Sequence, residues 1–345
     1  MGDSPAFPIG LPISTGGAES QRRYRYRQSR LKEDTVKAIA ITTTGGPEVL
    51  EVVELPEPHA GPGDVRIRVA AAAVNPTDTI FRAGWYRRQI DDGLPDVPGM
   101  DAAGTIDEVG EGVSRSIGDE VMAIVFPTGP SGGAYASQIV VPADSVADIP
   151  AGSTLIEAST LPMNGLTARL SLDQLALRPG QTLAVTGAAG AYGGYVIQLA
   201  KQDGLTVIAD ASEADESLVK ALGADVVVRR GDDVAHRIRE VMPDGVDGLA
   251  DGAVLDEKVL AAIRDGGDLA VVRGWKGPTE RDITLHQTFV SSYARNHDAL
   301  DRLRQQVEAG HVTLRVADTY DAADAPQAHR RLEAGGTRGR LVITF

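Results

Sequence analysis

Three glycines between two apolar runs are the residues in this chain whose type and spacing point most directly to chemistry. Gly187, Gly190 and Gly193 lie in the segment QTLAVTGAAGAYGGYVIQLAKQDGLTVIADAS, residues 181–212. Glycines allow a tight turn, and they let backbone N–H groups approach a pyrophosphate at the positive N-terminus of a following helix. Their spacing differs from G-x-G-x-x-G, because the first glycine comes one residue earlier. The segment predicts a nucleotide site that consists of Gly187, Ala189, Gly190, Ala191, Tyr192 and Gly193.

The end of the next apolar run bears on which dinucleotide such a site prefers. An acid there would accept the ribose 2′-hydroxyl of NAD, and Asp210 could do so if its side chain points inward. The 2′-phosphate of NADP needs donors instead. Ser212 and the guanidinium of Arg230, which ends the third run, could supply them. These residues leave both cofactors open.

Strands that alternate with helices must position the site. From about residue 165 to residue 292, short apolar runs alternate with helical patterns, which is typical of βαβ units and a parallel sheet. The expected strands are TLAVTGA, TVIADA, DVVVRR, VDGLADG and DLAVVRG. The expected helices are GGYVIQLAKQDG, EADESLVKALG, DDVAHRIREVM and DEKVLAAIRDG, the last being residues 256–266. We predict a doubly wound α/β domain over residues 165–292.

The chain before residue 165 has a different texture. Strand-like runs such as KAIAITTTG, VLEVVELPEP, DVRIRVAAAAV, DEVMAIV and ASQIVVPA are punctuated by Gly and Pro. In the third of these runs, alternation places Arg66 and Arg68 on the face opposite its valines and isoleucine. The C-terminal part, with a helix near residues 294–310 and a strand in GRLVITF, is too short to fold alone. We therefore predict one irregular β domain from residues 37–164 and 293–345.

Composition and charge limit the partners. The 345 residues are 42% hydrophobic and 24% charged, as in globular proteins. A formal net charge of -14 would repel the phosphates of nucleic acids and anionic membranes, and no apolar run reaches about 18 residues. We predict a cytoplasmic protein with neither kind of partner. Residues 1–36, which include the basic segment QRRYRYRQSRLK, are predicted to be a flexible extension.

Several longer motifs, in order along the chain, resemble those of one known family. They are AAAVNPTDTIFRAGWY (71–86), PDVPGMDAAGTIDEVGEGV (95–113), GDEV (118–121), GGAYAS (132–137), LPMNGLTA (161–168), the glycine segment and GRLVITF (339–345). Over residues 37–345 the chain resembles the zinc-free quinone oxidoreductases, the zeta-crystallin-like branch of the medium-chain dehydrogenase/reductase superfamily. The resemblance implies a GroES-like β domain with an inserted Rossmann-type domain, a cleft between them and a homodimer. It also implies NADPH-dependent reduction of a quinone or an activated α,β-unsaturated carbonyl.

The same resemblance implies roles for particular residues. Asn75 would lie by the nicotinamide, and Tyr86 would line the substrate cleft; both are our candidates for catalysis. Ser212 and Arg230 would hold the 2′-phosphate. The remaining positions implied to contact the nicotinamide end or the diphosphate are Thr167, Val272, Gly274 and Arg340.

Two departures from the family pattern concern the cofactor. Many relatives carry a lysine for the 2′-phosphate where this chain has Glu213, Asp215 and Glu216. NAD(H) therefore stays possible beside NADP(H). Tyr192 replaces a small aliphatic residue of the family's glycine loop, so it could narrow the approach to the diphosphate.

A metal-dependent alternative is the zinc alcohol dehydrogenases, which share this architecture. Their zinc needs cysteine and histidine ligands. This chain has no cysteine, it carries Met100 and Asp101 where a His-Glu pair would stand, and its six histidines show no ligand spacing. We predict no metal. Reduction of a conjugated acceptor needs no Lewis acid, because the charge spreads over the acceptor oxygens. Two alternatives stay open: an enoyl reductase for a specialised or carrier-bound metabolite, and a non-catalytic NAD(P)H-binding protein.

Overall fold

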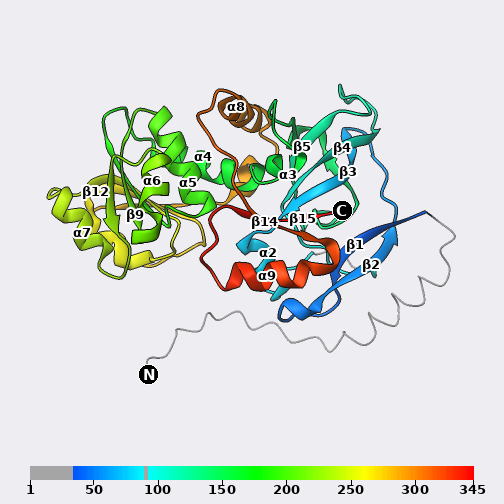
Figure 1. Cartoon of the computed structure of the whole chain (residues 1–345), viewed down its shortest axis with the longest axis horizontal. Helices are drawn as coiled ribbons and strands as arrows, with labels where there is room; N and C mark the ends of the chain where they lie inside the picture. The colour runs from blue at the N-terminus through cyan, green and yellow to red at the C-terminus, as the bar shows by residue number, and fades with distance from the viewer. Residues whose placement is uncertain (1–33, 89–91) are drawn as a thin grey trace.

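The computed structural model describes residues 34–88 and 92–345, which form two parts that lie side by side, each built on its own sheet (Figure 1). The basic segment of the predicted extension lies outside the described residues. The extension was predicted to end at residue 36, but strand β1 (Thr35–Ile41) already pairs with β2 (Leu50–Pro56) from Thr35 onward. The organised chain thus begins at Thr35, two residues earlier than predicted, because Thr35 and Val36 already pair with Pro56 and Leu55 of β2.

The first part is built on a seven-stranded sheet. Its order is β14–β15–β3–β4–β5–β7, and β6 pairs with β3 off this path. All these pairs are antiparallel except β14 with β15. The strands are β3 (Asp64–Ala73), β4 (Asp101–Val109), β5 (Glu120–Ile124), β6 (Gln138–Pro142), β7 (Val146–Asp148), β14 (Val316–Asp321) and β15 (Arg340–Thr344). The last two strands bring the C-terminal end of the chain back to the first sheet.

The second part is a six-stranded parallel sheet in the order β10–β9–β8–β11–β12–β13. The chain first moves outward from β8 and then restarts on the other side with β11. In open α/β sheets, ligands bind beyond the carboxyl ends of the strands at such a switch point. The strands are β8 (Thr182–Thr186), β9 (Thr206–Ala211), β10 (Val226–Arg229), β11 (Val246–Asp251), β12 (Ile263–Val271) and β13 (Thr284–Gln287).

Helices cover both sheets. The α-helices are α2 (Pro76–Arg82), α3 (Leu155–Ala158), α4 (Pro162–Leu175), α5 (Ala191–Gln202), α6 (Glu216–Ala221), α7 (Val234–Val241), α8 (His297–Glu308) and α9 (Ala325–Glu333). The 3₁₀ helices are η1 (Pro47–Val49), η2 (Ala143–Ser145), η3 (Glu213–Asp215), η4 (Asp256–Ala262), η5 (Val290–Tyr293) and η6 (Ala322–Asp324). Within the described part of the chain, none of the helices combines the length and apolar character that crossing a membrane requires.

The helix predicted for residues 256–266 is wrong. The segment forms the short 3₁₀ helix η4, and strand β12 begins directly after it. Ile263 pairs with Val246 of β11, which requires extended backbone at that point. Val259 and Leu260 are buried in the same cluster as Ile263, so tertiary packing and strand pairing, and not the local pattern, decide the backbone of this segment.

The two parts share an apolar core, through which α4 runs. Met122 of β5, Leu166 of α4 and Leu183 of β8 belong to one buried cluster. The boundary predicted at residue 165 falls inside this continuous helix. A Cβ on Gly165 would lie 2.9 Å from Leu161 Cδ1, so a glycine there allows close packing. Helix α4 is therefore a rigid support for side chains at the junction of the two parts.

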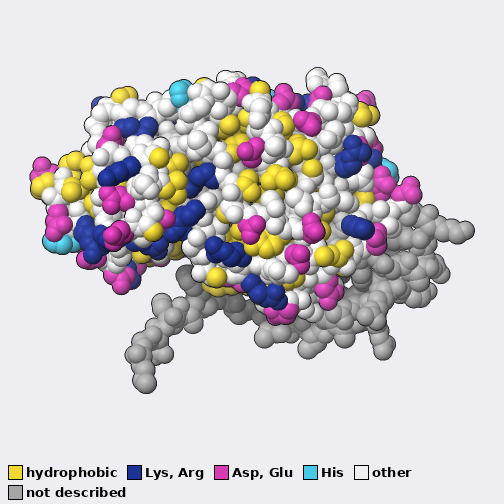
Figure 2. Space-filling view, in the orientation of Figure 1, with side chains coloured by type: hydrophobic (Ala, Val, Ile, Leu, Met, Phe, Trp, Pro, Cys, Tyr) yellow, Lys and Arg dark blue, Asp and Glu magenta, His cyan; other side chains and the backbone are white. Residues whose placement is uncertain are grey.

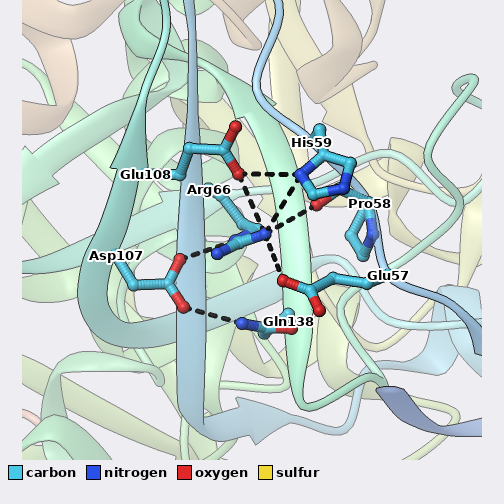
Figure 3. Close-up of polar contacts among 7 residues, drawn as sticks. All are labelled: Glu57, Pro58, His59, Arg66, Asp107, Glu108 and Gln138. Carbon is cyan, nitrogen blue, oxygen red and sulfur yellow. Dashed lines mark hydrogen bonds and ion pairs between the residues drawn. The ribbon is translucent and has the colours of Figure 1, made fainter. Parts of the chain in front are cut away.

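Strand β3 shows how alternation orders the first sheet. Val65, Ile67 and Val69 are buried, as the alternation predicts. Arg66 faces the other way, where it donates to Asp107 Oδ1 at 2.8 Å and Glu57 Oε1 at 2.5 Å (Figure 3). The same guanidinium lies 2.9 Å from Glu108, and Gln138 of β6 donates to Asp107. This network ties β3, β4, β6 and the segment after β2 together on the sheet face away from the core.

Candidate functional site

The glycine loop, residues 187–193, connects β8 to α5 at the switch point. Gly187 has a φ of +64°, and a Cβ there would lie 2.8 Å from the carbonyl carbon of Gly252. A Cβ on Gly193 would lie 2.5 Å from Gly187 O. At both positions the loop therefore has space only for a residue without a side chain. The close approach of these two glycines to neighbouring backbone holds α5 against the end of β8.

The first turn of α5 leaves backbone donors available. The loop closes with a hydrogen bond from Gly190 N to Gly187 O at 2.9 Å, and Gly194 N donates to Gly190 O at 3.0 Å. The N–H groups of residues 191–193 precede this last bond, so they have no acceptor within the helix. With the positive end of the helix dipole, they form the set of donors that a pyrophosphate takes at such a turn.

Arg315, which comes just before β14, holds the other side of the glycine loop. Its guanidinium donates to Ala189 O at 3.1 Å and to Gly190 O at 2.6 Å. Burial lowers the pKa of Arg315, and the nearby charge of Arg338 acts in the same direction. Arg315 was not predicted, because a single arginine in the segment TLRVAD has no spacing to another residue that would reveal the contact.

Asp210 of β9 points toward the glycine loop. Its Oδ1 accepts the N–H of Ala188 at 3.0 Å, and the residue is only 6% exposed. Burial raises the pKa of the Asp210 carboxyl, while the hydrogen bonds from the loop and the charge of Arg230 oppose this rise. A ribose hydroxyl would therefore have to share the carboxylate with the loop that it already supports.

Ser212 lies directly after β9, beside a buried carboxylate. Its hydroxyl donates to Asp215 Oδ2 at 2.5 Å. Arg338, from the turn between α9 and β15, donates to both carboxylate oxygens of Asp215. These hydrogen bonds lower the pKa of Asp215, and the charge of Arg230 contributes to the shift. The two residues predicted for a 2′-phosphate thus lie near a carboxylate and a further arginine that were not predicted.

Tyr192 and Thr167 lie where the glycine loop meets α4. The Tyr192 hydroxyl is 2.7 Å from Ser171 Oγ of α4, and its ring packs against Gly252 after β11. The Thr167 hydroxyl donates to Met163 O at 2.6 Å within the same helix. The tyrosine ring therefore fills space between the loop, α4 and the turn after β11.

A buried polar cluster lies where α2, β4, α4 and β15 meet. Asn75 donates to Asp101 Oδ2 at 2.7 Å, and Asp101 Oδ1 accepts Met163 N at 2.6 Å. The same terminal amide atom of Asn164 lies 2.9 Å from Asn75 Oδ1 and 3.1 Å from Arg340 Nε. In one orientation of the amide this atom is the nitrogen and donates to Asn75, and in the flipped orientation it is the oxygen and accepts from Arg340. Burial raises the pKa of Asp101 to about 6, against the charge of Arg340. The cluster brings two predicted residues together through Asn164.

A second buried chain of hydrogen bonds supports Asn75 from behind. Asp78 accepts Asn75 N at 2.7 Å and the Tyr135 hydroxyl at 3.1 Å. His329 Nε2 lies 3.2 Å from that hydroxyl, and Arg82 Nη1 lies 3.0 Å from His329 Nδ1. Because a guanidinium only donates, Nδ1 accepts and the proton sits on Nε2. Burial raises the pKa of Asp78 to about 7 and lowers that of His329 to about 3. The histidine is thus neutral, in one tautomer.

Three predicted residues remain, of which Tyr86 lies near enough to Asp78 for that charge to act on its pKa. Tyr86 donates its hydroxyl to Thr77 O at 3.0 Å, and burial raises its pKa, so this phenol holds its proton firmly. Val272 and Gly274 follow β12 at the carboxyl edge of the parallel sheet. Gly274 has a φ of +70°, which allows the turn there.

The glycine loop fits a dinucleotide, because an added Cβ would collide with backbone there and the N–H groups of the first turn of α5 have no acceptor within the helix. Over residues 34–88 and 92–345, no three His, Asp or Glu side chains come together as a metal site would require. The dinucleotide site lies at the switch point of the parallel sheet, and the buried polar cluster beside it comes mainly from the β-rich part. This combination defines a two-domain, nicotinamide-dependent oxidoreductase.

Comparison with known proteins identifies the family. Residues 61–151 match the family model for the alcohol dehydrogenase GroES-like domain, and residues 222–343 match that for zinc-binding dehydrogenases. The chain is 30% identical to a quinone oxidoreductase of Mus musculus over 334 residues, which covers 89% of this chain and 97% of the relative. The chain belongs to the medium-chain dehydrogenase/reductase superfamily, in the branch of the quinone oxidoreductases. The predicted fold class and family are confirmed.

Two further relatives bear on the cofactor. An NADPH-dependent alkenal/one oxidoreductase of Arabidopsis thaliana is 30% identical over 318 residues, covering 89% of this chain and 79% of the relative. A mycobacterial protein solved in complex with NADPH superposes with a TM-score of 0.78 at 32% identity, covering 90% of this chain and all of the other. A nicotinamide cofactor is thus supported by sequence, geometry and relatives alike.

Proposed function

We propose that this protein transfers a hydride from NADPH to a quinone or an activated α,β-unsaturated carbonyl, without a metal. One observation carries the proposal. Arg315 holds the glycine loop with its side chain, while its backbone oxygen accepts Arg340 N at 2.8 Å. The cradle for a pyrophosphate therefore adjoins the buried cluster that contains Asn75. A dinucleotide that lies along this path would have its nicotinamide end at the cluster.

The residues of the cluster would orient the cofactor and the acceptor. Reduced nicotinamide supplies the hydride when it is bound. Asn75 is held by Asp101 through its side chain and by Asp78 through its backbone N–H. The first of these bonds limits the rotation of the amide, and together they fix the fully buried Asn75 beside the path proposed for the cofactor. Holding reacting groups in a near-attack geometry is a large part of catalysis in such sites.

The chemistry of the donor set supports a reaction that needs no Lewis acid. Met100 and Asp101 occupy the place of the His-Glu pair of zinc alcohol dehydrogenases, and both oxygens of Asp101 already accept hydrogen bonds. Quinones and enones spread the arriving charge over their oxygens, so hydrogen bonds and solvent protons suffice. Tyr86 would serve as a wall of the acceptor site, since its hydroxyl is engaged with Thr77 and its pKa is raised by burial.

The preference for NADPH is supported by charge. Arg230 lies close enough to Asp210 and Asp215 to affect the pKa of both carboxyl groups. A guanidinium there suits a 2′-phosphate, which it can bind with two parallel hydrogen bonds. Asp210 would serve NAD less well, because its carboxylate already supports the glycine loop.

The test is the loss of reduced-nicotinamide absorbance, with NADPH and NADH in parallel against a bulky ortho-quinone and a simple enone. We expect turnover with NADPH to exceed that with NADH. Arg230→Gln should raise the KM for NADPH but not for NADH. Arg229→Gln is the matched control, because this neighbour pairs with Glu213 at 3.2 Å on the exposed surface. Faster turnover with NADH would instead assign the ribose to Asp210.

A second outcome separates the alternatives. If both cofactors bind but neither acceptor is reduced, an enoyl reductase for a specialised or carrier-bound metabolite replaces the proposal, and carrier-bound enoyl substrates are then tested. If these are not reduced either, a non-catalytic NAD(P)H-binding protein remains. A homodimer and a cytoplasmic location stay predictions; light scattering of the purified protein tests the former.

A further inference from the structure

Asp215 holds two donors at the adenosine end of the site. The residue is 6% exposed, and its carboxylate accepts the Ser212 hydroxyl at 2.5 Å. Arg338 reaches it from the other part of the molecule and donates to both oxygens, with Nη2 2.6 Å from Oδ2. A hydroxyl and a guanidinium that converge on one anion are also the groups that a phosphate monoester would take.

The place of this cluster along the chain matters. Ser212 follows the last residue of β9, and Asp215 ends the 3₁₀ helix η3 just after it. Strand β9 is the second strand of the βαβ unit that carries the glycine loop. In dinucleotide-binding domains, the end of that strand faces the ribose 2′ position.

Charges of both signs meet around Asp215. Arg230 and Arg338 both act on Asp215, and Arg230 also acts on Asp210. Lys and Arg side chains run from the region of α6 toward α9 on the face shown in Figure 2, although the whole chain has a net charge of -14. The two carboxylates offset the two guanidinium charges at the point where a dianionic 2′-phosphate would arrive.

We infer that Asp215 is a specificity-determining residue of the cofactor site: it occupies Ser212 and Arg338, the donors that a 2′-phosphate would use, and so weakens the preference for NADPH over NADH. The inference rests on the proposed function, since it takes the site as one for a nicotinamide dinucleotide. A bound 2′-phosphate must either displace the Asp215 carboxylate from Arg338 or lie beside its negative charge. NADH carries no such group, so it meets neither cost.

The test is the change Asp215→Asn, which removes the charge but keeps the size and one acceptor. Dissociation constants are measured by calorimetry for 2′,5′-ADP and 5′-AMP, and for NADPH and NADH. We expect the affinity for 2′,5′-ADP to rise about tenfold relative to that for 5′-AMP, which corresponds to a difference of about 1.4 kcal/mol. The NADPH to NADH affinity ratio should rise by a similar factor.

Two further variants isolate the cause. Glu216→Gln makes the same change in charge one residue along, where the carboxylate pairs with Lys220 at 2.6 Å on the surface of α6. It should leave both ratios within about twofold of the wild type. Adding Arg338→Gln to Asp215→Asn should abolish the gain, because the freed donor is then missing.

The outcomes are distinct. An unchanged ratio in Asp215→Asn, with 5′-AMP binding and melting temperature as in the wild type, overturns the inference. An equal gain in Glu216→Gln also overturns it, because the effect would then be long-range charge alone. If the wild type reduces no acceptor but Asp215→Asn still gains affinity for 2′,5′-ADP, the inference holds and the proposed reaction fails. A wild type that binds none of the four ligands overturns both.

Discussion

Replacing Gly187 by alanine should affect both stability and cofactor binding, for two reasons that the structure separates. The residue has a φ of +64°, and left-handed backbone costs an alanine about 1–2 kcal/mol. A Cβ there would also lie 2.8 Å from the carbonyl carbon of Gly252, and overpacking of this kind costs about 1–3 kcal/mol. Because the added Cβ meets local backbone in the first case and Gly252 in the second, the two costs add, and we expect the free energy of unfolding to fall by about 2–5 kcal/mol.

Two other glycines provide matched controls for these contributions. Gly180 has a φ of +87° with nothing within 4 Å of an added Cβ, so Gly180→Ala should cost only about 1–2 kcal/mol. Gly193 is not in the left-handed region, but its Cβ would lie 2.5 Å from Gly187 O. Gly193→Ala should therefore cost about 1–3 kcal/mol through crowding alone.

The assay is urea unfolding of the three variants and the wild type, together with calorimetric titration of each with NADPH. Gly187→Ala and Gly193→Ala should bind NADPH at least about tenfold more weakly, because any shift of the loop moves the donors of the first turn of α5. Gly180→Ala, on the loop before β8, should bind normally. The reasoning is refuted if Gly187→Ala is no less stable than Gly180→Ala, or if it binds NADPH as tightly as the wild type.

Three further predictions concern the residues around the site. Arg315→Met removes two hydrogen bonds to carbonyl groups of the glycine loop, so the dissociation constant for NADPH should rise about tenfold in calorimetry; an unchanged constant would show that the loop holds itself. Asp101→Asn replaces one accepting oxygen by an NH2 group, which then faces another donor, either Asn75 Nδ2 or Met163 N. We expect kcat to fall about tenfold or more while NADPH binding changes little. Single-turnover kinetics would show this. His329 has a pKa of about 3, below its ordinary value of 6.5, so its contribution to stability is full above pH 6.5 and is lost as the pH falls toward 3. The difference in unfolding free energy between the wild type and His329→Gln should therefore shrink over that range; urea titrations show this, and a constant difference would contradict it.

The glycine loop and the alternation of β3 were predictable from sequence because each depends on local geometry. Gly187 and Gly193 mark a tight turn between a strand and a helix, and Val65 and Ile67 mark the buried face of a strand. Spacing along the chain carries such information directly. Residues 256–266 show the limit of that approach, because pairing of Ile263 with β11 overrides a locally helical pattern.

The sequence alone identified the family, the alternation of strands and helices over most of residues 165–292, and the segments that carry the cofactor loop. The tertiary structure alone decided which polar side chains meet at the cofactor loop and around Asn75. Arg315 contacts Ala189 across 126 residues, Arg338 contacts Asp215 across 123, and Arg82 contacts His329 across 247. These contacts have no period or spacing in the chain, and their strength depends on burial and on donor–acceptor geometry, which exist only once the chain has folded.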